Sequence, residues 1–84
     1  MDLDAAVLTD HAKEQMSRRK IDEADVRQIL AAPEETAVVR EGRIVAQGMI
    51  GDQLLRIFVD VDRTPPEVVT AYRTSKIDRY RSRP

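Results

Sequence analysis

The stretch Gln53–Asp62, QLLRIFVDVD, is expected to form a strand of the sheet on which this chain is built. Its apolar residues recur at every second position, which is the spacing of a β-strand with one face buried. The face expected to form the core carries Leu55, Ile57, Val59 and Val61. The opposite face carries Leu54, Arg56, Phe58, Asp60 and Asp62, and is expected to remain for solvent, a partner or a ligand.

Strands are also expected on both sides of this stretch. Two expected strands, Thr36–Arg40 (TAVVR) and Arg43–Ile50 (RIVAQGMI), lie on either side of Glu41-Gly42. Gly51-Asp52 then precedes the strand Gln53–Asp62. Glycine beside a short polar residue favours tight hairpin turns, so these segments predict an antiparallel meander. A fourth strand, EVVTAY at Glu67–Tyr72, is expected after a Thr-Pro-Pro turn.

Two short helices are expected before the sheet. The first is capped by Thr9 or Asp10 and runs to about Arg19. The second begins after Asp22, which is the expected N-cap, and ends near Ala31-Ala32 because Pro33 restricts the residue before it. The sequence therefore predicts an α+β fold with two N-terminal helices packed on one face of a four-stranded antiparallel sheet and a short basic C-terminal tail.

Composition limits the classes of protein to which the chain can belong. Its 84 residues allow one domain, 1–84, in which residues 75–84 form a tail that could be flexible or begin with a helical turn. The absence of cysteine favours a reducing compartment, and no apolar run predicts a signal peptide or a membrane span, so we expect a cytoplasmic protein. One histidine and no cysteine cannot form a zinc site, and we expect no metal and no other cofactor.

His11, the single histidine, is the first candidate for chemistry. Helical spacing places it on one face with Gln15 and Arg18, and Arg19 lies beside that face. An imidazole could serve as general acid or base while an arginine stabilises negative charge on a reacting phosphate. The alternative is that His11 only completes the first helical turn and Arg19 pairs with an acid such as Asp22 or Glu23.

Basic residues near the C-terminus are the second candidate. They are interleaved with Tyr72 and Tyr80 and comprise Arg73, Lys76, Arg79, Arg81 and Arg83. Arginine suits phosphate and tyrosine suits stacking on bases, so the mixture fits RNA, although charged termini are usually only solvated. Phe58 is expected to be an interface contact, edge packing or a base-stacking platform. The pair Asp60 and Asp62 either binds a divalent ion or aids solubility.

Several stretches of the chain carry a resemblance to a known family. They are HAKEQMSRRKIDEADVRQIL, then PEET, a hairpin with GR, the strand LLRIFVDV and the closing strand VVTAYRT. From about Asp10 to Thr74 the chain resembles the bacterial domain-of-unknown-function family 4258. The residues that match the family's recognisable elements are His11-Ala12, Met16, Arg19, Lys20-Ile21 and Thr70-Ala71-Tyr72. Lys20 stands where that family usually has glycine, so either the backbone is left-handed there or the helix ends differently.

That family is in turn similar to RelE-type ribonuclease toxins, including the BrnT branch, which cleave RNA without metal. The resemblance implies a toxin-type domain with catalytic residues His11, Arg19, Arg73 and Tyr72. It also implies RNA contacts from Arg18, Arg56, Lys76, Arg79 and Tyr80, and a cognate antitoxin or other protein as partner. The alternative function is a non-catalytic protein- or RNA-binding regulatory module.

Overall fold

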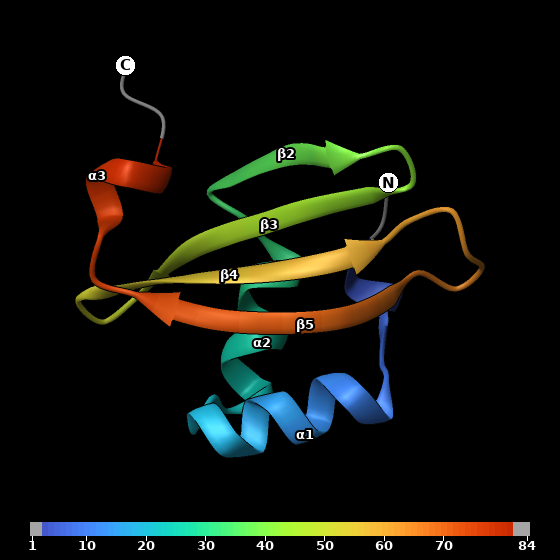
Figure 1. Cartoon of the computed structure of the whole chain (residues 1–84), viewed down its shortest axis with the longest axis horizontal. Helices are drawn as coiled ribbons and strands as arrows, with labels where there is room; N and C mark the ends of the chain where they lie inside the picture. The colour runs from blue at the N-terminus through green and yellow to red at the C-terminus, as the bar shows by residue number, and fades with distance from the viewer. Residues whose placement is uncertain (1–2, 82–84) are drawn as a thin grey trace.

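A computed structural model describes residues 3–81 as one twisted sheet with helices around it (Figure 1). The helical elements are η1 (Leu3–Ala5), α1 (Asp10–Arg19), α2 (Glu23–Ala31) and α3 (Ile77–Tyr80). The strands are β1 (Val7–Leu8), β2 (Glu35–Arg40), β3 (Arg43–Ile50), β4 (Gln53–Asp60) and β5 (Glu67–Thr74). Both predicted helices and all four predicted strands are present, so the α+β class is confirmed.

The prediction of a four-stranded antiparallel sheet is confirmed for β2 to β5 but misses one strand. The sheet has five strands in the order β1-β5-β4-β3-β2, and β1 lies parallel to β5 with Val7 beside Glu67 and Leu8 beside Val68. A two-residue strand has no alternation to read, and it pairs with residues about 60 positions away. Only the folded chain therefore reveals it.

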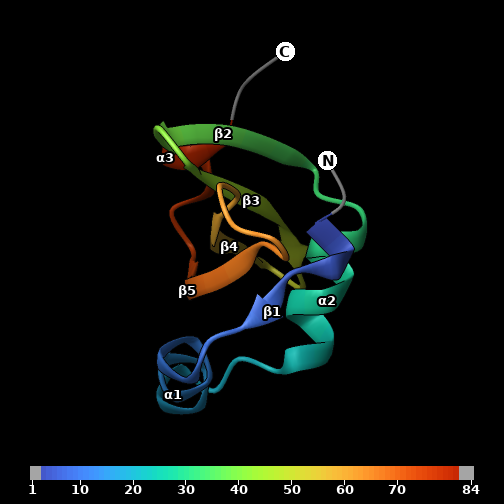
Figure 2. The ribbon, with the colours of Figure 1, turned by 90° about the vertical axis from the view of Figure 1, so that its right-hand side faces the viewer.

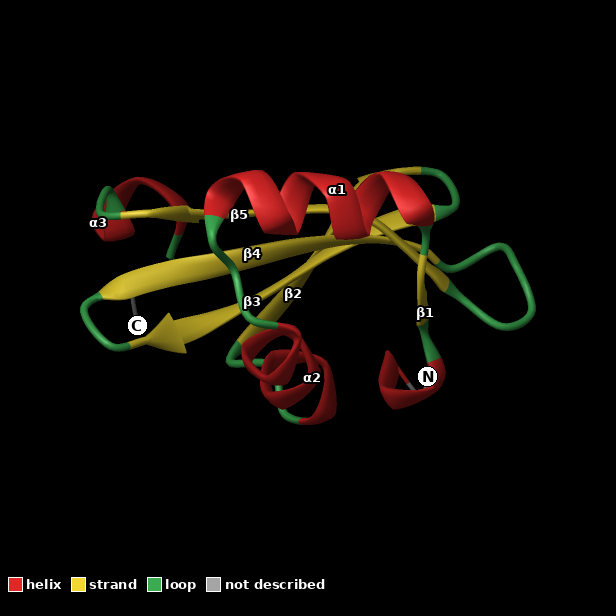
Figure 3. Cartoon of the chain, turned by 90° about the horizontal axis from the view of Figure 1, so that it is seen from below, coloured by secondary structure: helices red, strands yellow, loops and turns green. Residues whose placement is uncertain are grey.

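The two long helices take different positions against the sheet. Helix α2 packs against β3 and β4, whereas α1 runs alongside β5 (Figures 2 and 3). The prediction that both helices cover one face thus holds fully for α2 only. Among residues 3–81, no helix is long and apolar enough to cross a membrane.

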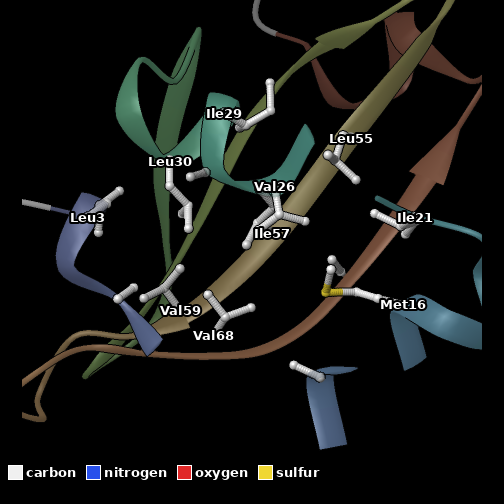
Figure 4. Close-up of a cluster of buried hydrophobic side chains, with 14 residues drawn as sticks. Leu3, Met16, Ile21, Val26, Ile29, Leu30, Leu55, Ile57, Val59 and Val68 are labelled. Carbon is white, nitrogen blue, oxygen red and sulfur yellow. The ribbon is translucent and has the colours of Figure 1, made fainter. Parts of the chain in front are cut away.

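The core forms where these helices meet the predicted apolar face of β4 (Figure 4). Leu55, Ile57 and Val59 are at most 1% exposed, which confirms the alternation read from the sequence. Met16 from α1 and Val26 from α2 join them in one hydrophobic cluster. Burial of these side chains is the main source of stability for so small a domain.

The opposite face of the sheet is less open than the sequence predicts. Leu54 is fully buried there, and Val45 and Gln47 are 3% exposed. Helix α3 returns over this face, where the side-chain amide of Gln47 donates to the backbone carbonyl of Tyr80 at 2.8 Å. The start of the predicted tail, as far as Arg81, is therefore packed against the sheet, while Arg83 lies outside the described residues.

The helix ends agree only in part with the predicted caps. Thr9 caps α1, since its Oγ1 accepts from the Ala12 amide at 3.0 Å and also donates to the Val68 carbonyl at 2.9 Å. Lys20 ends α1 in the left-handed conformation, with φ 56° and ψ 45°. Asp22 is the N-cap residue of α2, as predicted, but its side chain makes no cap hydrogen bond.

This difference between the caps is testable by substitution. We expect Thr9→Ala to lower the free energy of unfolding by about 1–2 kcal/mol, because it removes both a cap and a link to β5. Asp22→Ala should cost only a few tenths of a kcal/mol, since no cap bond is lost. Urea denaturation measures both, with Thr9→Ser as the control that keeps the hydroxyl. Equal losses for the two alanine variants would contradict this assignment.

Candidate functional site

The centre of the face opposite α2 holds three polar side chains in a row across three strands. Gln47, Arg56 and Tyr72 are direct neighbours in register on β3, β4 and β5. Arg56 donates from Nε to Oε1 of Gln47 at 2.9 Å and from Nη1 to the hydroxyl of Tyr72 at 2.6 Å. The strand pairing itself therefore fixes the guanidinium between two oxygen atoms.

Aromatic rings surround the same guanidinium. The Cζ atom of Arg56 lies 4.2 Å from the ring centre of Tyr80, 5.5 Å from that of Phe58 and 5.7 Å from that of Tyr72. Phe58 and Tyr72 are stacked at 6.0 Å, and Tyr80 meets Tyr72 edge-on at 6.3 Å. These are cation–π distances, and each contact stabilises the positive charge in place. We call Gln47, Arg56, Phe58, Tyr72 and Tyr80 the Arg56 cluster.

The Arg56 cluster is closed on one side by α3 and the start of β2. Besides the bond to the Tyr80 carbonyl, the Gln47 amide lies 3.4 Å from a carboxylate oxygen of Glu35. Arg81 and Glu34 form an ion pair next to this contact. Side-chain contacts thus link the Glu35 carboxylate through Gln47 and Arg56 to the Tyr72 hydroxyl.

The chemistry available at the Arg56 cluster follows from these contacts. Arg56 donates to two uncharged oxygen atoms, and these bonds leave its positive charge available for an anion. Phe58, Tyr72 and Tyr80 are only half-buried, so ring surface remains accessible for stacking. A fixed cation, flat rings, a hydroxyl and a carboxylate together fit a phosphate-containing ligand that also carries aromatic bases.

A second group of predicted residues meets at the outer edge of β5. Arg19 donates from Nη1 to the Ala71 carbonyl at 2.7 Å and lies 3.4 Å from Oγ1 of Thr70. Arg73 in turn donates to the Arg19 carbonyl at 3.0 Å. The predicted pairing of Arg19 with Asp22 or Glu23 is therefore replaced by bonds to β5. Next to these contacts is an open hollow of about 510 Å³ lined by Arg19, Gln53, Tyr72 and Arg73.

His11 joins neither group. It is exposed in the first turn of α1, and Arg19 ends the same helix, about 12 Å further along the axis at 1.5 Å per residue. The structure thus brings Arg19 and Arg73 together and leaves the imidazole apart from them. Arg18 is exposed and paired with Glu14 at 2.7 Å.

The two remaining predicted contacts lie on α3. Lys76 is the exposed N-cap residue of that helix, and the Cζ of Arg79 lies 5.7 Å from the ring centre of Tyr80. Both are thus next to the Arg56 cluster rather than in it. Of the residues predicted from the sequence, the cluster contains Arg56, Tyr72 and Tyr80 together with Phe58.

Asp60 has a different role from the two considered for it. It is buried in an ion pair with Arg43, with distances of 2.6 and 3.2 Å between the guanidinium and its two oxygen atoms. Hydrogen bonding to Arg43 lowers the pKa of Asp60 below its ordinary 3.8, although burial opposes this shift. The carboxylate is thus held by its neighbour on β3 and does not act merely as a solubilising group.

This ion pair predicts how stability depends on pH. Because the folded pKa of Asp60 is below the unfolded value of 3.8, its contribution is fully present above that pH and is lost as pH falls through the folded pKa. The difference in unfolding free energy between the wild type and Asp60→Asn should therefore be largest near neutral pH and shrink in acid. Urea denaturation across pH measures this difference, and a constant value would contradict the assignment.

Gln47 and Glu35 are site residues that the sequence reasoning missed. Gln47 interrupts the apolar run of β3 at a position that is 3% exposed, and a buried amide requires hydrogen-bond partners. That interruption is a signal visible in RIVAQGMI. Glu35 carries no such signal, because a glutamate at the start of a strand is ordinary.

Comparison with known protein families gives a match over most of the chain. The family model described as Domain of unknown function (DUF4258) matches residues 8–73, which include α1, α2 and nearly all of the sheet. No curated protein and no solved structure matches the chain. The match includes every member of the Arg56 cluster except Tyr80.

Proposed function

The chain belongs to the DUF4258 family, whose function is unknown, and we propose that it is a RelE-type domain that binds single-stranded RNA and cleaves it without a metal ion. The resemblance to RelE-type toxins, including the BrnT branch, motivates this proposal. It also implies action in the cytoplasm and a cognate antitoxin that inhibits the domain.

The observation that carries the proposal is the Arg56 cluster. Arg56 is held 2.6 Å from the Tyr72 hydroxyl with the Tyr80 ring 4.2 Å away, on a face that β3, β4 and β5 share. A guanidinium recognises phosphate oxygen atoms, and tyrosine and phenylalanine rings stack on unpaired bases. Both kinds of contact with RNA are thus available within one group of side chains.

We assign two side chains to the cleavage step, Tyr72 and Arg56. A water molecule accepts the proton of a ribose 2′-hydroxyl, and the resulting oxyanion attacks the adjacent phosphorus. As the bond from phosphorus to the 5′-oxygen breaks, the Tyr72 hydroxyl donates its proton to that oxygen. The products are a 2′,3′-cyclic phosphate and a 5′-hydroxyl, so the step consumes no cofactor.

Arg56 is assigned the electrostatic part of this step. Its guanidinium neutralises the extra negative charge on the phosphorus centre and then the Tyr72 phenolate that remains after proton transfer. Because its position is already fixed by Gln47 and the rings, little reorganisation is needed when charge develops. His11 has no role in this assignment, and Arg19 and Arg73 contribute to binding rather than to bond cleavage.

The direct test uses purified full-length protein and a 5′-labelled single-stranded RNA in the presence of EDTA. We expect fragments that end in a 2′,3′-cyclic phosphate. Binding without cleavage would instead favour the second candidate, a non-catalytic RNA-binding module. The half-buried rings around Arg56 favour that candidate too, because stacking alone binds RNA. Absence of both binding and cleavage would reject the RNA-based proposal.

A further inference from the structure

The hollow beside β5 combines two guanidinium groups, of Arg19 and Arg73, that form no ion pair with a carboxylate of residues 3–81. Arg19 is bound to the Ala71 carbonyl and Arg73 to the Arg19 carbonyl, so each keeps its full positive charge while its position is fixed. Both side chains are exposed, and both line the hollow of about 510 Å³ together with Gln53. We infer that this hollow is a second RNA-binding site beside the Arg56 cluster, and that it binds one backbone phosphate of the RNA. This inference rests on the proposed function.

The strand edge supplies further hydrogen-bond donors to the hollow. Among residues 3–81, β1 pairs with β5 at Glu67 and Val68, and beyond these residues the outer edge of β5 is bordered by α1 instead of by a strand. The Ala71 carbonyl points to this edge, where Arg19 binds it. Because backbone direction alternates along a strand, the N–H of Arg73 points to the same edge. Amide and guanidinium donors along one strand edge are suited to phosphate oxygen atoms.

Tyr72 connects the hollow with the Arg56 cluster. Its hydroxyl accepts the bond from Arg56 on one face, and the same residue lines the hollow next to Arg73. An RNA strand with one phosphate in the hollow can therefore pass over the edge of β5 and present its next nucleotides to the cluster. The inference predicts that long RNA contacts both sites, whereas a dinucleotide needs only the cluster.

Inorganic phosphate is the first probe of the hollow. On titration into ¹⁵N-labelled protein, we expect the side-chain signals of Arg19, Gln53 and Arg73 to shift together and to saturate. In Arg73→Gln the Gln53 shift should disappear. The matched control is Arg63→Gln, which removes an exposed arginine paired with Glu67 and should leave the titration unchanged. Equal shifts at all exposed arginines, or none at Gln53, would overturn the inference.

Single-stranded RNA is the second probe. We expect Arg73→Gln to weaken binding of a long oligonucleotide roughly tenfold and to lower the salt dependence by about one counterion, without affecting a dinucleotide. Unchanged binding of the long RNA would overturn the inference. If the wild type binds phosphate at the hollow but no RNA, the proposed function fails and the phosphate site stands.

Arg73→Gln also removes the bond to the Arg19 carbonyl, so its folding requires a check by thermal unfolding. Gln53→Ala is the second variant for this purpose, since it keeps both arginines and their bonds to backbone. We expect it to weaken phosphate binding without changing the melting temperature. If Gln53→Ala binds phosphate as the wild type does, the amide is not a ligand and the hollow as assigned is rejected.

Discussion

Replacing Tyr72 with phenylalanine is expected to lower the rate of RNA cleavage by about 10²–10⁴-fold, the usual contribution of a general acid. Phenylalanine keeps the ring that stacks on Phe58 at 6.0 Å and removes only the hydroxyl that accepts the bond from Arg56. Stacking on RNA should therefore survive. We expect kcat to fall while KM changes little, which single-turnover and steady-state assays on a labelled oligonucleotide measure.

Two further variants separate chemistry from structure in this experiment. Arg56→Gln should reduce both cleavage and binding, because the charge that contacts phosphate is lost. Arg63→Gln removes an exposed arginine outside the Arg56 cluster and should leave kcat and KM unchanged. If Tyr72→Phe cleaves at the wild-type rate, the assignment of Tyr72 as general acid is wrong, even if RNA cleavage itself is real.

The parts of the fold that follow from a local sequence pattern could be predicted. Alternation in QLLRIFVDVD placed Leu55, Ile57 and Val59 in the core, and Gly42 and Gly51 adopt the positive φ values that their hairpin turns require. Strand β1 and the packing of α3 were not predictable in this way. Both depend on contacts between segments far apart in the chain, and neither segment is long enough to show a period of its own.

Part of the Arg56 cluster could have been derived from the sequence. The turn at Gly51-Asp52 pairs Ile50 with Gln53, and counting outward from it places Gln47 directly beside Arg56. Tyr72 could not be placed by counting, because the pairing of β4 with β5 shifts register between Phe58 and Val59. A bulge of this kind moves every later residue to the other face, so only the folded sheet decides which side chain meets Arg56.

The predicted grouping of His11 with Arg19 and Arg73 is not found in the fold, although helix geometry could have excluded it. Residues 11 and 19 of one straight helix are separated by about 12 Å along the axis, which is too far for both side chains to contact one reacting group. The pairing of Arg19 with Arg73 depended on α1 lying along β5, which a basic pattern alone does not specify. Sequence reasoning thus selected residue types that suit RNA, while strand register and helix placement decided which of them meet.

Ile57→Ala is expected to destabilise the fold strongly. Ile57 is fully buried at the centre of the cluster formed by α1, α2 and the sheet (Figure 4), where a truncated side chain leaves a cavity. We expect a loss of about 2–5 kcal/mol in the free energy of unfolding, and a fall in melting temperature of roughly 4–8 °C for each kcal/mol.

The matched control is Val38→Ala on the edge strand β2, where the side chain is 77% exposed. Its removal should change the free energy of unfolding by no more than about 0.5 kcal/mol. Both variants truncate a β-branched residue to alanine in a strand, so strand propensity affects them alike and burial distinguishes them. Equal destabilisation of the two variants would show that strand propensity, rather than the buried face of β4, dominates the stability of this sheet.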